Sequence, residues 1–176
     1  MGLDMYFYAK TKNKVDVTNL EDDNYHSFCS WDGEGKVDET NYPEDLKELG
    51  DYIYKTNFKS SFIDDDGFTL YQIGYFRKFN ALHAYIVDTL GYGVDECQEI
   101  EITKDDLLTL LDNLKLVANN KGAAEDILPT RAGFFFGSYD YDDYYFEDVK
   151  DAIEMCELFL EHIDFNKYDL IYQASW

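Results

Sequence analysis

Basic residues are scarce in this sequence. The 176-residue chain has 15 lysines and arginines against 37 aspartates and glutamates, which gives a formal net charge of −22. Such a charge repels nucleic acid and anionic membrane surfaces over a screening length of about 8 Å at physiological salt. The composition therefore excludes direct binding of DNA, RNA or a membrane surface, and it favours a protein partner with a basic surface.

Cysteines and long apolar runs are also scarce. Cys29, Cys97 and Cys156 lie far apart and form no CxxC pair, which excludes a disulfide framework and a structural zinc site. No run approaches the roughly 18 apolar residues that a membrane-spanning helix needs. The start, MGLDMYFYAK, has no basic leader followed by a long apolar stretch. We expect a cytoplasmic protein.

Catalytic and metal-binding motifs are missing as well. The sequence has no GxGxxG, no Walker loop, no HExxH and no GxSxG. Its three histidines are too widely spaced to predict a metal site. The stretch SYDYDD, residues 138–143, places carboxylates close together but lacks the central glycine and the twelfth-position glutamate of an EF-hand. We expect no metal, no cofactor and no catalytic residue, which favours a binding protein over an enzyme.

The apolar pattern predicts an α+β fold with a mixed or antiparallel sheet and about three main helices packed on one face. Predicted strands cover residues 3–9, 68–76, 97–102, 133–137 and 168–176. Predicted helices cover residues 43–55, 78–90, 104–120 and 147–162. Thr103 and Asp106 have the spacing of a capping box before the third helix. We expect one domain over residues 1–176, with a loop-rich, variable insertion at about 11–66.

The predicted last helix has two unlike faces. At 100 degrees per residue, its apolar stripe contains Val149, Ile153, Cys156, Leu160 and Ile163. The opposite side carries Glu147, Asp151, Glu154, Glu157 and Glu161. Like charges three or four residues apart repel by a few tenths of a kcal/mol, so stability alone does not favour such a row. A stiff row of carboxylates can occupy a groove made for phosphates, which suggests a DNA mimic. An ordinary solvated acidic face is the alternative.

A segment rich in aromatic rings and carboxylates leads into this helix. It contains Tyr139, Asp140, Tyr141, Asp142 and Asp143, and we expect it to contact the same partner as the acidic row. Aromatic residues make up 18% of the chain, which exceeds what one small core readily absorbs. This surplus favours a homodimer interface.

A second candidate site uses the few cations. Arg77, Asn80 and His83 recur every three residues at the start of a predicted helix, where backbone N–H groups favour anions. Together with Lys78, Tyr139 and Asp140, they could form a pocket for an anionic metabolite or a nucleotide. The alternative is that the cations pair with surplus acids and that His83 is a satisfied, partly buried side chain. A catalytic role of His83 stays open, although no nucleophile accompanies it.

Several stretches of the sequence resemble one family. They are MGLDMYFYAK, IGYFRKFNALHAYI, GYGVDEC, LPTRAGFFFGSYDYDDYYFEDVKDAIE and YQASW. Together they are similar to small proteins encoded by tailed phages and prophages, over most of the chain outside residues 11–66. Phe76 and Phe79 stand where that family is expected to have Trp and Ala.

The resemblance implies a phage origin but supplies no activity. Phages often use small acidic proteins against host enzymes that bind DNA. The resemblance therefore leads us to expect an acidic interaction protein that acts in the cytoplasm of the host cell. Such a protein would bind and inhibit a nucleic-acid-binding or defence protein of the host.

Overall fold

A computed structural model describes residues 2–14, 42–56, 60–133 and 136–176. The strands are β1 (Asp4–Thr11), β2 (Ser61–Ile63), β3 (Thr69–Arg77), β4 (Ile100–Ile102) and β5 (Tyr168–Ser175). The α-helices are α1 (Lys47–Thr56), α2 (Asn80–Thr89), α3 (Lys104–Asn119), α4 (Ala124–Ile127) and α5 (Asp143–His162). Two short 3-10 helices, η3 (Glu44–Leu46) and η4 (Lys121–Ala123), precede α1 and α4.

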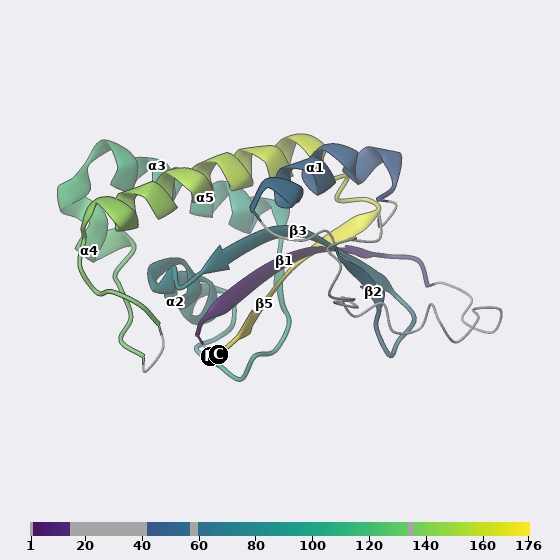
Figure 1. Cartoon of the computed structure of the whole chain (residues 1–176), viewed down its shortest axis with the longest axis horizontal. Coiled ribbons are helices and arrows are strands. Elements are labelled where there is room, and N and C mark those ends of the chain that lie inside the picture. The colour runs from purple at the N-terminus through teal and green to yellow at the C-terminus, as the bar shows by residue number, and fades with distance from the viewer. Residues whose placement is uncertain (1, 15–41, 57–59, 134–135) are drawn as a thin grey trace, which may run out of the picture.

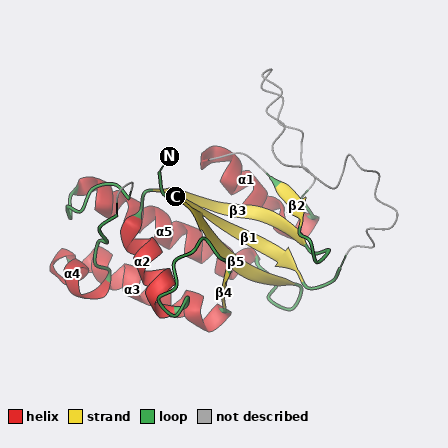
Figure 2. Cartoon of the chain, turned by 90° about the horizontal axis from the view of Figure 1, so that it is seen from below, coloured by secondary structure: helices red, strands yellow, loops and turns green. Residues whose placement is uncertain are grey.

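The five strands form one antiparallel sheet in the order β2-β3-β1-β5-β4. The first and last strands pair along their length, from Asp4 opposite Ser175 to Thr11 opposite Tyr168. The two ends of the chain therefore lie side by side (Figure 1). Figure 2 shows the strands in this order across the sheet, from β2 at one edge to β4 at the other. The predicted α+β class is confirmed, and the sheet is antiparallel.

Helices α1, α3 and α5 lie above the sheet in Figure 1, with α5 running over its central strands. Helix α2 lies at the end of the sheet where both chain termini are found. The strand side chains facing the helices, including Met5 and Phe7, belong to one buried cluster with Met155 and Phe159 of α5. This burial supplies the hydrophobic free energy that fixes α5 on the sheet.

Glycine at position 74 permits the close approach of α5 to β3. A Cβ atom at Gly74 would lie 2.9 Å from both Met155 Sδ and Phe159 Cζ, and 3.2 Å from Phe7 Cβ. Real Cβ atoms essentially never come that near to another heavy atom. The missing side chain thus leaves room for the ends of the Met155 and Phe159 side chains against β3.

Most predicted elements are found, but the predicted strand at residues 133–137 is wrong for its described residues. Gly133, Phe136 and Gly137 form a loop, while residues 134–135 lie outside the described part of the chain. The physical reason is that the Phe136 carbonyl accepts a hydrogen bond from the Asn80 side chain, not from a neighbouring strand. Gly137 has a φ of +92°, which is incompatible with an extended strand.

The start of α5 and the presence of strand β2 also differ from the prediction. Helix α5 begins at Asp143, four residues earlier than expected, because the Asp142 side chain accepts a hydrogen bond from the Tyr145 N–H and caps it. Strand β2 lies within the polar stretch 11–66 and was not predicted. The capping box of Thr103 and Asp106 is present as predicted. Most of the expected loop-rich insertion, residues 15–41, lies outside the described residues.

Replacing Gly74 with alanine tests the contact between α5 and β3. The added methyl group has no space, so we expect Gly74→Ala to lower the free energy of unfolding by roughly 1–3 kcal/mol. Gly122→Ala is the matched control, because the nearest atom to its Cβ would be 3.4 Å away. Chemical denaturation should show the control unchanged or slightly stabilised. Equal stability of the two variants would contradict the tight packing.

Candidate functional site

Helix α5 presents its predicted acids to solvent. Glu147, Asp151, Glu154, Glu157 and Glu161 are all exposed. On the other side, Val149, Cys156 and Ile163 are buried, and Ile153 and Leu160 are half-buried against the core. The two faces follow from the helical period, because one side packs on the sheet and the other cannot. We call these five exposed acids the acidic face.

Part of the acidic face is neutralised. Lys115 Nζ of α3 lies 2.7 Å from Glu157 Oε1, and His162 Nε2 lies 3.9 Å from Glu161 Oε2. Lys150 is exposed on the same helix. Glu147, Asp151 and Glu154 form no ion pair with any described residue. Exposed ion pairs stabilise by only about 0–1 kcal/mol, so the pair with Lys115 could open for a partner.

Hydrogen bonds and ring packing within the protein hold the segment that leads into α5. The Tyr141 hydroxyl accepts a hydrogen bond from the Thr130 N–H, and its ring packs edge-on against Tyr145 with centroids 5.0 Å apart. Asp142 is occupied as the cap of α5. These two predicted partner-binding residues therefore serve mainly to position their neighbours.

The remaining predicted residues of this segment reach solvent. Asp140 and Asp143 are exposed, and Tyr139 is half-exposed with its hydroxyl donating to the Gly133 carbonyl. Tyr144, which the sequence did not single out, has 77% of its surface exposed. The acidic face of α5 is thus continued at its N-terminal end by two further carboxylates and two aromatic rings.

The second predicted site is a pocket of about 240 Å³ at the start of α2. Four of its six predicted residues line this pocket, namely Arg77, Lys78, Asn80 and Asp140. His83 and Tyr139 do not. The lining also contains Thr130, Asp142, Tyr144, Tyr145 and Asp148. We call it the α2 pocket; its walls carry both positive and negative side chains.

Lys78 has an unusual backbone in this pocket. Its φ is +66°, a left-handed conformation that non-glycine residues adopt at some cost. Hydrogen bonds hold it there, because the Lys78 N–H donates to the Leu3 carbonyl at 2.8 Å and the Lys78 carbonyl accepts from the Asn80 N–H at 2.9 Å. A Cβ atom at neighbouring Gly137 would lie 3.1 Å from Lys78 Cβ. Backbone strain of this kind often marks functional sites.

The Asn80 side chain joins α2 to the loop before α5 through hydrogen bonds. Its buried side chain donates to the carbonyls of Phe136 and Ser138 at 2.9 and 2.8 Å, and its oxygen accepts from the Arg131 N–H at 3.0 Å. Both donor hydrogens are therefore used within the protein. Asn80 shapes the α2 pocket and has no free N–H to offer a ligand.

His83 is fully buried and lies in a hydrogen-bonded chain of side chains. Its Nε2 is 3.1 Å from Asp95 Oδ2, and its Nδ1 is 2.7 Å from the Tyr172 hydroxyl. A carboxylate only accepts, so Nε2 carries the proton and Nδ1 accepts from Tyr172. The other oxygen of Asp95 accepts from the Trp176 indole N–H at 3.1 Å. Burial lowers the pKa of His83, while the Asp95 carboxylate partly opposes that shift.

This chain corrects the prediction for His83. Both ring nitrogens are occupied and the side chain has no exposed surface, so His83 cannot contact a ligand in the α2 pocket. Sequence reasoning missed Asp95 and Tyr172 as its partners, because they lie 12 and 89 residues away. The signal present in the sequence was a histidine on an apolar helix, which is typical of a satisfied core side chain.

Asp148 lines the α2 pocket and has a perturbed acidity. Burial, together with a smaller contribution from the nearby carboxylates of Asp151, Glu147 and Asp142, raises the pKa of Asp148 to about 6. The side chain is half-buried and forms no hydrogen bond with the described residues. Near neutral pH, this ionised group destabilises the fold, which is common where residues are retained for binding.

Comparison with known proteins supplies no relative from which a function could be transferred. No protein-family model, no curated protein sequence and no solved structure matches the chain. Among the described residues, no group of three or more His, Cys, Asp or Glu side chains is placed to hold a metal ion. No described helix is long and apolar enough to cross a membrane. A function therefore has to come from the side chains themselves.

Asp148→Asn should stabilise the protein in a pH-dependent way. The unfolded chain binds this proton only near the ordinary pKa of 3.8, whereas the folded protein binds it near pH 6. At pH 7.5 the ionised carboxylate therefore destabilises the folded state, and removing it should raise the free energy of unfolding by about 1 kcal/mol after allowance for solvent screening.

The gain should shrink as the pH falls through 6 and vanish below about 4, where both states of the wild type are protonated. Denaturant unfolding across this range measures it. Glu154→Gln, an exposed acid on the same helix, is the control and should change stability by less than about 0.5 kcal/mol at any pH. A gain that persists at pH 4 would contradict the assignment.

Proposed function

We propose that this protein binds a partner protein with a basic surface through the acidic face of α5 and the segment 139–143. The observation that carries the proposal is the placement of five exposed acids on one side of a helix whose other side is buried. Because the helix is packed on the sheet and capped at its start, the backbone positions that carry the carboxylates are fixed before binding. Such preorganisation reduces the entropy that a partner must overcome.

The spacing of the acidic face suits a groove that follows a single nucleic acid strand. Residues 147–161 span about 21 Å at 1.5 Å per residue, which gives one carboxylate per roughly 5 Å. One DNA strand carries a phosphate per about 3.4 Å of axis, and the duplex one per about 1.7 Å. We infer that the acidic face imitates part of one phosphate backbone and does not replace a whole duplex.

The partner class follows from the charge and from the resemblance to phage proteins. We propose a host protein that binds nucleic acid or serves in defence, inhibited in the host cytoplasm when the acidic face covers its phosphate-binding surface. The acids would pair with lysines and arginines that otherwise contact phosphates. The exposed rings of Tyr139 and Tyr144 would add apolar contact area at the N-terminal end of the helix.

Neutralising the acidic face should abolish partner binding without unfolding the protein. The variant Asp151→Asn, Glu154→Gln, Glu157→Gln, Glu161→Gln removes four charges and also relieves like-charge repulsion along α5. We expect wild-type protein immobilised on beads to retain a host protein from lysate at physiological salt, and the variant to retain none. Added duplex DNA should compete for the host protein and release it from the beads.

The matched control removes the same number of charges elsewhere. Four exposed acids on α3 and α4 are suited to this purpose, namely Asp105, Asp112, Glu125 and Asp126. Their amide variant should bind as the wild type does. If both variants lose the partner equally, net charge and not the acidic face is responsible, and the proposal is wrong.

The α2 pocket supports a second candidate function, the binding or sequestration of an anionic metabolite or nucleotide. The specific observation in its favour is that two of the chain's few cations, Arg77 and Lys78, meet at one pocket beside the start of α2. Phe79, which precedes α2, provides no side-chain cap. The strained backbone of Lys78 also points to this place.

Thermal unfolding with a panel of nucleotides and small anionic metabolites tests the second candidate. A ligand at 100 times its dissociation constant should stabilise the wild type by about 2.7 kcal/mol. Lys78→Gln should remove that shift, whereas Lys104→Gln, an exposed lysine outside the pocket, should keep it. Absence of any shift across the panel would count against the pocket as a ligand site.

A further inference from the structure

Among the described residues, none pairs with the outer edge of strand β4. It is the last strand in the order, and its residues pair only with β5, from Ile100 opposite Tyr172 to Ile102 opposite Leu170. Within the described part of the chain, residues 99–102 make no backbone hydrogen bond outside that ladder. An edge of this kind presents N–H and C=O groups to which another extended chain can pair.

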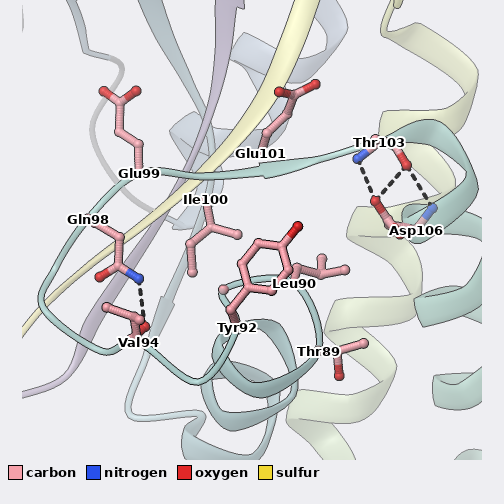
Figure 3. Close-up of a pocket in the computed structure, with 11 residues that line it drawn as sticks. Thr89, Leu90, Tyr92, Val94, Gln98, Glu99, Ile100, Glu101, Thr103 and Asp106 are labelled. Atoms are coloured by element: carbon pink, nitrogen blue, oxygen red, sulfur yellow. Dashed lines mark hydrogen bonds between the residues drawn. The ribbon is translucent and has the colours of Figure 1, made fainter.

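A hollow of about 650 Å³ runs beside this edge. Figure 3 shows Ile100 of β4 pointing to one side of the strand, toward Leu90 and Tyr92 of the loop after α2. Tyr92 has 95% of its surface exposed, and Val94 has 46%. On this side of the strand the Ile100 side chain is itself buried, while Tyr92 and Val94 next to it present apolar groups to solvent. We call the β4 edge together with this hollow the edge groove.

The backbone of the loop holds Tyr92 in this position at some cost. Its φ is +55°, in the left-handed region that a tyrosine rarely adopts. The turn is fixed by hydrogen bonds from the Gly93 N–H to the Val87 carbonyl and from the Val94 N–H to the Gly91 carbonyl. An aromatic ring that a strained turn projects into water is suited to a contact with a partner.

The other side of β4 is acidic. Glu99 and Glu101 belong to the residues that line the hollow, and their side chains point to the opposite side of the strand from Ile100 in Figure 3. Glu101 is exposed and forms no ion pair with a described residue, while Glu99 shares Lys10 with Asp64 at 2.9 and 2.8 Å. No lysine or arginine lines the hollow. The charge at this edge therefore calls for a cationic partner.

We propose that the edge groove binds an extended segment of a basic partner in which cationic and apolar residues alternate. Successive side chains of a strand point to opposite faces, so a segment paired with β4 places every second residue over Glu99 and Glu101. The residues between them enter the hollow beside Tyr92 and Val94. This surface shares no residue with the acidic face of α5, so it goes beyond the function proposed above.

A second copy of this chain fits the edge groove poorly. Two β4 strands paired with each other would bring Glu101 of each copy near Glu99 and Glu101 of the other copy. Like charges opposite each other destabilise a strand pair. The short strand and its acids thus protect the edge against self-association while leaving it open to a basic segment.

Fluorescence anisotropy with labelled synthetic peptides tests the proposal on the full chain. The probe is a short peptide that alternates lysine and valine. It should bind at least about tenfold more tightly than a peptide with the same residues in two blocks, because only the alternating peptide matches both faces. Methylating the backbone nitrogens that face β4 should weaken binding by a similar factor, because the added strand loses its hydrogen bonds.

Two substitutions locate the site. Glu101→Gln removes the central charge, and Tyr92→Asn removes the ring while keeping a residue that tolerates a left-handed backbone. Both positions are exposed, so both variants should fold, and each should weaken the alternating peptide by about fivefold or more. The α5 variant with four neutralised acids is the control and should keep the preference for the alternating peptide.

Three results would overturn the proposal. Equal binding of the alternating and block peptides would mean that the peptide lysines are attracted only by the net negative charge of the protein. Equal binding of the N-methylated peptide would exclude strand addition. Failure of the peptide to bind, together with a protein dimer that Tyr92→Asn dissociates in sedimentation, would identify a second copy as the occupant.

Discussion

The acidic face depends on the burial of the apolar side of α5, to which the packing of Met155 and Phe159 at Gly74 of β3 contributes. Because no side chain stands at that position, Met155 and Phe159 rest directly on the strand. The helical period gathers the apolar residues on the buried side of the helix, and the remaining side carries the acids outward. Close packing in a protein interior allows little freedom for such a helix to rotate. The acidic face is therefore a rigid feature of the fold.

The scarcity of cations determines what remains on the surface. Several of the described basic side chains are held by carboxylates, namely Lys10, Lys12, Lys115, Arg131 and Lys167. Acids outnumber them so heavily that Glu147, Asp151 and Glu154 of α5 and Glu101 of β4 form no ion pair with a described residue. A basic partner would relieve this repulsion, so its binding gains from both attraction and the loss of self-repulsion. The same surplus opposes association between copies of the chain through these two acidic surfaces.

The sequence predicted the elements whose pattern is local. Alternation and helical period identified most strands and helices, and the spacing of Thr103 and Asp106 identified a cap. It failed where a distant side chain decides the structure, because the Asn80 side chain donates to the Phe136 carbonyl and Phe136 lies in a loop. It also misplaced His83, whose partners come from remote segments. The acids of α5 were placed correctly because a helix has one buried side, whereas the edge groove has no sequence signature.

Zero-length carbodiimide crosslinking of the protein to its captured partner identifies the carboxylates that touch the partner, because the reagent joins carboxylates only to lysines in contact with them. Binding through the acidic face should give crosslinks at Glu147, Asp151, Glu154 and Glu161. Crosslinks confined to acids outside α5 and the segment 139–143, such as Asp105, Asp112, Glu125 or Asp126, would contradict it.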